Sequence, residues 1–318
     1  MTTDVIAPRG HTAERSDRKR PRRRAWWRNW QLYSLLVLPV IWFVVFRYVP
    51  MAGNIIAFRT YLPGGNIFGE GWVGFDNFAM FLSDPSFWQV FRNTVMLGGL
   101  SLIFGFPIPL ILALLLNEVR SRGFKRFVQT TTYLPHFLSI VIVAGMVMQL
   151  TSATGSINQL LGVFGVKPVQ FLLDPGWFPA IYVISEIWQT AGWGTILYLA
   201  ALTTIDESLY EAARIDGAGR LKQIWHVTLP GIRPTIVTLL ILNIGSFMAV
   251  GFEKILLLYN PAIYSTSDVI STYLYRVGLQ SGSFSYAAAI GIFEAVIGLV
   301  LVLSANFLSR RMIGASLW

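Results

Sequence analysis

The chain carries few of the side chains that perform covalent chemistry. It has no cysteine, and its three histidines, His11, His136 and His226, lie far apart in the sequence. Thiolate chemistry is therefore excluded, and a histidine metal site has no ligand spacing to support it. None of the lysines follows a glycine, so the Gly-Lys-Ser/Thr loop that binds nucleotide phosphates is absent. The sequence predicts no catalytic residue, no metal site and no cofactor in this chain.

The polar side chains that stand out lie inside long apolar stretches, where burying them costs free energy and so suggests function. Residues 178–202 combine hydroxyl and amide groups with flat aromatic faces, which suits a ligand such as a sugar. The alternatives are that each tryptophan packs between helices and that the carboxylate is bonded to a neighbouring helix. A second group of polar residues lies in residues 234–258. Its charged pair, Glu253 and Lys254, is expected to lie at the membrane interface or at a gate. The residues concerned are Glu186, Trp188, Gln189, Thr190 and Trp193 in the first stretch, and Asn243, Ser246, Glu253 and Lys254 in the second.

These stretches belong to a chain that is too apolar for a soluble protein. Hydrophobic residues make up 54% of its 318 residues and charged residues 13%, against roughly 25% charged in soluble domains. Six windows are nearly free of charge and long enough to cross a bilayer as helices, which excludes soluble enzymes and disordered proteins. We therefore predict an all-α membrane protein with six transmembrane helices, the second of them kinked at Pro107 and Pro109. The predicted spans are residues 31–49, 93–116, 132–150, 178–202, 234–258 and 286–308.

The positive charge of the chain predicts its orientation. The net charge is +9, and nine of the 25 basic residues precede residue 29. Basic residues gather on the cytoplasmic side of membrane proteins, and the segments between the second and third spans and between the fourth and fifth are basic as well. We expect both termini to be cytoplasmic, with residues 1–30 forming a basic tail and residues 31–318 forming the membrane domain. Trp26, Trp27 and Trp30 suit the membrane interface, so the tail predicts topology and not nucleic-acid binding.

The inner segment 203–233 carries the most specific pattern. Asp206 is placed to cap a short helix, and Gly217 and Gly219 are placed to end it. A second short helix is expected from about Arg220 and should stop before Pro230. Two such helices form a small knob that fits a groove on another protein, with acidic side chains at its rim. The alternative is a re-entrant or surface-lying connector.

The amino-acid sequence of this segment resembles a known motif. Glu211-Ala212-Ala213-x-x-Asp216-Gly217-Ala218, followed by Leu229-Pro230 and Pro234, resembles the EAA loop of binding-protein-dependent ABC importer permeases. The resemblance extends from about residue 31 to residue 318. Further motifs are similar to the polysaccharide and oligosaccharide subgroup of carbohydrate importers. They are Asn117-Glu118-Val119-Arg120, Tyr133-Leu134-Pro135-His136-Phe137, Gly192-Trp193-Gly194, Tyr198-Leu199-Ala200, and Asp268 through Tyr273.

The resemblance implies a type I ABC importer permease fold in a bacterial cytoplasmic membrane, moving an oligosaccharide or polysaccharide fragment. Its implied partners are a second related permease, two ATPase subunits that hold ATP and Mg, and an extracytoplasmic sugar-binding protein. It further implies roles for two groups of residues. The coupling residues to the ATPase are Glu211, Ala212, Ala213, Asp216, Gly217 and Ala218, and the substrate-path residues are Trp188, Gln189, Thr190, Trp193, Phe247, Met248 and Gly251.

Two other classes of protein compete with this interpretation. A subunit of an ion- or proton-coupled secondary transporter would use an intramembrane carboxylate such as Glu294, but it would also show inverted repeats and broken midplane helices. Such repeats are not evident in the sequence. A membrane enzyme would need a cluster of loop carboxylates, whereas those of this chain are scattered.

Overall fold

The computed structural model describes residues 30–313, and the basic tail predicted for residues 1–30 lies almost entirely outside that range. Within it the chain is helical, with one isolated antiparallel bridge between Arg59 and Trp72 as its β-structure. The chain divides into two compact units, residues 1–53 and 54–318. The all-α class predicted from composition is confirmed for the described residues.

The described part of the first unit is one apolar helical run. It consists of α2 (Trp30–Phe43), a π-helical turn η1 (Val44–Tyr48) and α3 (Val49–Ala52). The wide π turn ends two residues before Pro50. Because proline lacks an N–H and its ring presses on the carbonyl four residues earlier, the wider turn accommodates it within the helix. Residues Tyr33–Phe58 are long and apolar enough to cross a membrane, in agreement with the first predicted span.

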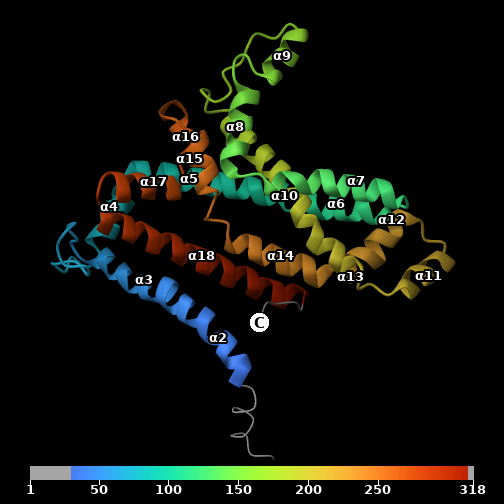
Figure 1. Cartoon of the computed structure of the whole chain (residues 1–318), viewed down its shortest axis with the longest axis horizontal. Helices are drawn as coiled ribbons and strands as arrows, with labels where there is room; N and C mark the ends of the chain where they lie inside the picture. The colour runs from blue at the N-terminus through green and yellow to red at the C-terminus, as the bar shows by residue number, and fades with distance from the viewer. Residues whose placement is uncertain (1–29, 314–318) are drawn as a thin grey trace, which may run out of the picture. The chain divides into compact units, whose positions relative to one another are not determined.

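The second unit is a bundle of helices of very different lengths (Figure 1). Its elements, in chain order, are η2 (Gly53–Phe58), α4 (Asp76–Ser83), α5 (Pro85–Leu100), η3 (Ser101–Gly105), α6 (Pro107–Glu118), α7 (Arg122–Tyr133), η4 (Leu134–Phe137), α8 (Ile140–Thr151), α9 (Ser156–Val163), α10 (Phe178–Leu202), α11 (Glu207–Ile215), α12 (Arg220–Gln223), η5 (Ile224–Thr228), α13 (Leu229–Gly231), α14 (Arg233–Gly245), α15 (Phe252–Leu258), η6 (Pro261–Ile263), α16 (Tyr264–Ser267), α17 (Ile270–Tyr275), η7 (Arg276–Gln280) and α18 (Phe284–Ile313).

Four helical segments of the described chain are long and apolar enough to cross a membrane, and a fifth would be a bent pair. Besides Tyr33–Phe58 they are Pro85–Glu118, Ile140–Val163 and Phe284–Arg311, which overlap the second, third and sixth predicted spans. The predicted fourth span, residues 178–202, is the continuous helix α10 with those bounds. It is long enough to span, but its polar side chains make it less apolar than the other four.

The fifth predicted span, residues 234–258, is wrong as a single helix. α14 ends at Gly245 and the chain becomes helical again at Phe252 in α15. The six residues between them are held by contacts that replace helical hydrogen bonds. The Gly251 N–H donates to the Tyr182 hydroxyl of α10 at 3.1 Å. The Phe247 carbonyl lies against Gly98 of α5, where a Cβ would stand 2.6 Å from that oxygen.

The third predicted span also begins later than expected. Residues 132–139 belong to the end of α7 and to the 3-10 turn η4, and α8 starts at Ile140. Pro135 interrupts the helical pattern, and the Ser139 side chain caps the new helix by accepting from the Ile142 N–H at 3.3 Å. A serine before an apolar run is a recognised helix start, so this boundary follows from local chemistry.

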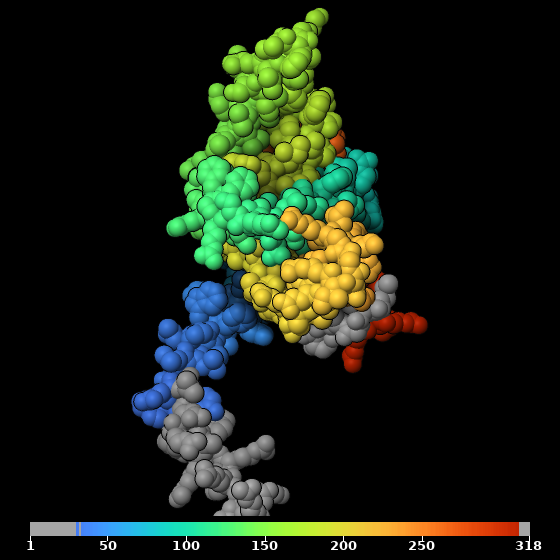
Figure 2. Space-filling view, turned by 90° about the vertical axis from the view of Figure 1, so that its right-hand side faces the viewer, coloured from blue at the N-terminus to red at the C-terminus, as the bar shows by residue number. Residues whose placement is uncertain are grey.

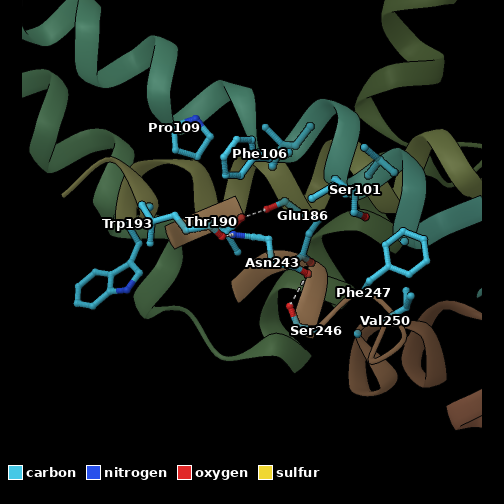
Figure 3. A pocket seen from close by; sticks show the side chains of 18 of the residues that line it. Ser101, Phe106, Pro109, Glu186, Thr190, Trp193, Asn243, Ser246, Phe247 and Val250 are labelled. Atoms are coloured by element: carbon cyan, nitrogen blue, oxygen red, sulfur yellow. Dashed lines mark hydrogen bonds between the residues drawn. The ribbon is translucent and has the colours of Figure 1, made fainter. Parts of the chain in front are cut away.

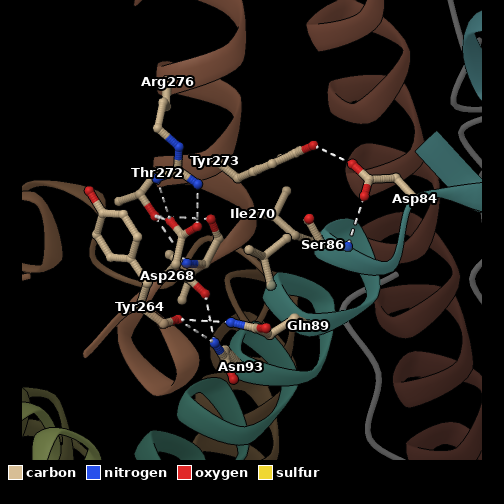
Figure 4. Close-up of polar contacts among 12 residues, drawn as sticks. Asp84, Ser86, Gln89, Asn93, Tyr264, Asp268, Ile270, Thr272, Tyr273 and Arg276 are labelled. Carbon is tan, nitrogen blue, oxygen red and sulfur yellow. Dashed lines mark hydrogen bonds and ion pairs between the residues drawn. The ribbon is translucent and has the colours of Figure 1, made fainter. Parts of the chain in front are cut away.

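Polar contacts fix α5 to the segment that contains α16 and α17 (Figure 4). The Asn93 amide donates to the Asp268 carbonyl at 3.0 Å, and the Ile270 N–H donates to the Thr94 hydroxyl at 2.9 Å. The Asp268 carboxylate forms an ion pair with Arg276. Asn93, Thr94 and Asp268 are buried, so these contacts pair groups that would be costly to leave unpaired.

A second contact of the same region joins the start of α5 to α17. The Asp84 carboxylate accepts from the Tyr273 hydroxyl at 2.8 Å and from the Ser86 N–H at 2.8 Å. Burial alone would raise the pKa of Asp84, but these hydrogen bonds outweigh it and hold the pKa below its ordinary value of 3.8.

The neighbouring glycines of α5 provide a test of the packing against the broken segment. Gly98→Ala should lower the free energy of unfolding by about 1–3 kcal/mol, since its methyl group would displace the Phe247 carbonyl. Gly99→Ala is the matched control, because nothing lies within 4 Å of a Cβ there. It should be neutral or stabilise by up to about 1 kcal/mol. Thermal unfolding of the purified variants in detergent measures both, and equal melting temperatures for the two would contradict the close approach.

Candidate functional site

A cavity of about 470 Å³ lies within the second unit, between α5, η3, α6, α10, α14 and the broken segment 246–251. Its wall mixes polar groups with aromatic faces, and many of these side chains can be seen in Figure 3. The polar members are Ser101, His136, Tyr182, Glu186, Thr190, Tyr198, Asn243 and Ser246, and the aromatic carbon faces come from Phe106, Trp193 and Phe247.

α10 supplies one wall of the cavity through its helical period. Val183, Glu186, Thr190, Trp193 and Leu197 recur at spacings of three and four, so they share a face, and all of them line the cavity. The adjacent face is buried in packing. It contains Ser185, Gln189, Gly192 and Thr195. The helix therefore presents Glu186, Thr190 and Trp193 to the cavity, while the buried face, which also contains polar side chains, packs against neighbouring helices.

The structure separates the seven residues predicted for a substrate path. Thr190, Trp193, Phe247 and Gly251 line the cavity. Gln189 and Met248 are buried outside it, and Trp188 projects from α10 without lining it. The predicted residues were chosen because they are adjacent in sequence. The cavity is lined by one face of the helix, and adjacent residues of a helix point in different directions.

Sequence reasoning did not assign Ser101, Phe106 or His136 to the site. His136, at the 3-10 turn η4, stacks on Trp193 with ring centroids 4.6 Å apart and planes 6° apart. Ser101 lies in the π turn η3 and its hydroxyl is buried without a hydrogen-bond partner. The proline-containing motif around His136 was noticed in the sequence, but no pattern placed it opposite Trp193.

A buried ion pair joins α10 to α15. Lys254 Nζ lies 2.5 Å from a carboxylate oxygen of Glu186, and the Lys254 side chain is 1% exposed. The Lys254 side chain is therefore packed inside the protein; the membrane interface or a gate stays the predicted place of the charged pair. The expectation that Glu186 is bonded to a neighbouring helix is confirmed. Glu186 also lines the cavity, and its side chain is 34% exposed.

The inner segment 203–233 forms a compact knob, seen in yellow and orange on the near face of the second unit in Figure 2. Asp206 caps α11 by accepting from the Ser208 N–H at 2.9 Å, and that backbone hydrogen bond lowers the pKa of Asp206. α11 ends at Ile215, and Gly217 follows its cap residue Asp216 with φ +73°. The Ala218 N–H bonds to the Ala213 carbonyl at 2.8 Å and the Gly217 N–H to the Arg214 carbonyl at 3.0 Å, which is a Schellman motif.

The second helix of the knob is longer than predicted. It runs from Arg220 through the π turn η5 and past Pro230 to Gly231, so the expected stop before Pro230 is wrong. As before Pro50, a π turn ends two residues before the proline and makes room for its ring. The Tyr210 hydroxyl, 3.0 Å from the Thr228 hydroxyl, ties α11 to this second helix.

The knob exposes the residues of the sequence motif. Glu211, Ala212, Asp216 and Gly217 are exposed, whereas Ala213 and Ala218 are half-buried. Large apolar side chains are exposed beside them, namely Leu209, Ile215, Leu221 and Trp225. Ile215 is 87% exposed. Such a concentration of apolar side chains on a polar loop is typical of a surface that contacts another protein or the membrane.

The described residues contain no group of three or more His, Cys, Asp or Glu side chains that could hold a metal ion.

The chain is similar to known transport proteins. Residues 105–314 match the family described as binding-protein-dependent transport system inner membrane component. The chain is 47% identical over 281 residues to the polygalacturonan/rhamnogalacturonan transport system permease protein YteP of Bacillus subtilis (strain 168), covering 88% of each.

Two solved structures are similar over almost the whole chain. A bacterial ABC transporter involved in the import of the acidic polysaccharide alginate has a TM-score of 0.85 and 48% identity, covering 91% of this chain and 98% of that one. The alginate transporter in complex with an alginate pentasaccharide-bound periplasmic protein also has a TM-score of 0.85, with 47% identity and coverage of 92% and 99%.

Proposed function

The chain belongs to the family of binding-protein-dependent transport system inner membrane components, and we propose that its cavity is one half of a sugar path and its knob the contact with an ATPase. It is a permease subunit of an ABC importer for oligosaccharides or polysaccharide fragments, located in the inner membrane. The observation that carries this conclusion is the similarity to the alginate importer over 91% of the chain. The alternative of an ion-coupled secondary transporter finds no support among these relatives.

The arrangement in the membrane that we propose has six spans with both termini inside. Four apolar helical segments account for four of them, and we assign the fifth to α14, the second member of the bent pair, together with α15. We assign the remaining one to α10, whose polar face is turned to the cavity and not to lipid. Residues 31–318 then form the permease domain and residues 1–30 an inner basic tail.

The wall of the cavity supports its role as a sugar path. Hydroxyl and amide groups from three elements face the same space as Trp193, whose ring is stacked on His136. Sugars bind through hydroxyl hydrogen bonds and through packing of C–H faces on aromatic rings. Because the cavity belongs to one permease, the second related permease of the importer completes the path from its own side.

The knob supports coupling to a partner ATPase. Its caps and the Tyr210–Thr228 contact make it rigid, and it exposes the motif residues together with apolar side chains. We propose that Glu211, Ala212, Ala213, Asp216, Gly217 and Ala218 seat in a groove of the ATPase subunit. ATP and Mg are held in that subunit, and an external sugar-binding protein delivers the cargo.

The whole importer, purified in lipid through a tag on this chain, tests the function. We expect an ATPase subunit to co-purify and its activity to rise several-fold when the external binding protein is added loaded with its sugar. The unloaded binding protein is the control. A preparation without an ATPase subunit would contradict the assignment, whichever sugar the importer transports.

Changes in the knob should uncouple transport without unfolding the membrane domain. Gly217→Pro cannot adopt φ +73° and should disrupt the end of α11, and Glu211→Lys reverses a charge on the exposed face. Both should reduce transport at least tenfold while membrane insertion is kept. Gly219→Ala is the control, because Gly219 has φ −67° and open space around it. Normal transport and normal ATPase association in both variants would exclude the coupling role.

Trp193→Ala should weaken transport more than assembly, since it removes the aromatic face that His136 supports. We expect a reduction of up to about tenfold in initial uptake, with the amount of assembled importer unchanged, because an aromatic contact contributes about 0.5–1.5 kcal/mol and about 1.4 kcal/mol is a factor of ten. Trp188→Ala tests whether the cavity or the sequence pattern identifies the substrate path, because the sequence pattern assigned Trp188 and Trp193 the same role. The cavity geometry predicts a much smaller effect at Trp188. Unchanged uptake in Trp193→Ala would make Trp193 a packing residue.

A further inference from the structure

The formally charged side chains on the cavity wall are all of one sign. Among the described residues that line the cavity, Glu186 is the one carboxylate, and no lysine or arginine is present. Its neighbours on the wall, such as Thr190 and Asn243, are neutral. A molecule in the cavity therefore meets a single formal charge from this chain, and that charge is negative.

The positive partner of Glu186 cannot be reached from the cavity. Lys254 is 1% exposed and does not line the cavity, and its ammonium also lies 5.9 Å from the centre of the Tyr182 ring. A buried ammonium needs such a partner, because leaving it unpaired would carry a large desolvation cost. Lys254 thus contacts Glu186 from the protein side, while Glu186 stays accessible from the cavity.

An accessible carboxylate discriminates between kinds of sugar. Because it only accepts hydrogen bonds, it pairs with sugar hydroxyl groups, which donate, and charge makes these bonds stronger than neutral ones. A uronate carboxylate has no donor to offer and is repelled by a like charge. For an acidic polysaccharide such as alginate, which the similar transporter imports, this wall offers no cationic partner, and the nearer charge of the Glu186–Lys254 pair is the negative one.

We propose that Glu186 is a specificity-determining residue of the sugar path and that Lys254 is its positioning residue. Glu186 accepts hydrogen bonds from the hydroxyl groups of the passing sugar and favours neutral or esterified segments over free uronates. The proposal rests on the cavity being the sugar path. The sign of the wall potential, however, can be measured without any knowledge of the cargo.

The absence of cysteine makes that measurement direct. Thr190→Cys places a thiol on the cavity face, one helical turn from Glu186. In the assembled importer, the rates of its modification by the cation methanethiosulfonate-ethyltrimethylammonium and by the anion methanethiosulfonate-ethylsulfonate are read by mass spectrometry of this chain. With Glu186 present, we expect the cation to be favoured relative to its reaction with a free thiol.

Adding Glu186→Gln should shift the ratio of the two rates about tenfold toward the anion. A unit charge about 6 Å away in water-like surroundings changes each rate about threefold, in opposite directions. Lys254→Met, which leaves the carboxylate unpaired, should shift the ratio toward the cation, and the double variant should fall between wild type and Glu186→Gln. If Lys254→Met does not assemble, the double variant keeps the comparison, since it carries no unpaired buried charge.

Glu294→Gln is the matched control, because it makes the same chemical change on α18, away from the cavity lining. It should leave the ratio unchanged. A ratio that is equal in wild type and Glu186→Gln would overturn the proposal and make the ion pair purely structural.

Sugar selectivity is read from protection of the same thiol by two probes of equal length, trigalacturonate and its fully methyl-esterified form. In wild type the ester should protect at concentrations at least threefold lower than the acid, and Glu186→Gln should remove or reverse this preference. Equal protection by both probes in both variants would overturn the inference and leave the path assignment standing. A shift in the charge ratio with no protection by either probe would instead contradict the path assignment.

Discussion

The structure depends on pairing the polar groups that the broken segment between α14 and α15 would otherwise leave unpaired. A break inside a membrane bundle frees backbone groups that lipid cannot satisfy. Here α10 contacts the segment and the helix that follows it: the Tyr182 hydroxyl accepts the Gly251 N–H, and Glu186 pairs with the Lys254 side chain of α15. The break in turn brings Phe247 and Gly251 to the cavity. The same contacts therefore stabilise the irregular backbone and shape the site.

The polar composition of α10 follows from this role. A helix that faces lipid on one side, neighbours on another and a cavity on a third needs a different kind of residue on each face. Gly192 allows α7 to approach closely, and Glu186 and Thr190 line the cavity. This explains why a 25-residue helix in the middle of the bundle is less apolar than four other segments of the described chain.

The parts of the fold that depend on neighbouring residues could be predicted from the sequence. Residues within one or two turns determine the bounds of α10, the cap at Asp206 and the termination of α11 before Gly217. The break after Gly245 could not be predicted in this way, because it depends on Gly98 and Tyr182, which are distant in sequence. The stop predicted before Pro230 is wrong for a related reason. A π turn ends two residues before that proline, as it does before Pro50 and Pro107, so the helix continues through it.

The path of the chain links the knob to the cavity. From Arg220 the helix runs through η5 and α13 to Gly231, bends by 65°, and continues as α14 to Gly245, where the broken segment that lines the cavity begins. Helices are stiff along their axes, so in the proposed mechanism a displacement of the knob by the ATPase moves α14 as a lever. The lever ends at the broken segment, which Tyr182 of α10 contacts, and α15 after it is paired with α10 through Lys254 and Glu186. Closing and opening of the cavity must then work against those two contacts, which gives the ion pair a mechanical as well as an electrostatic role.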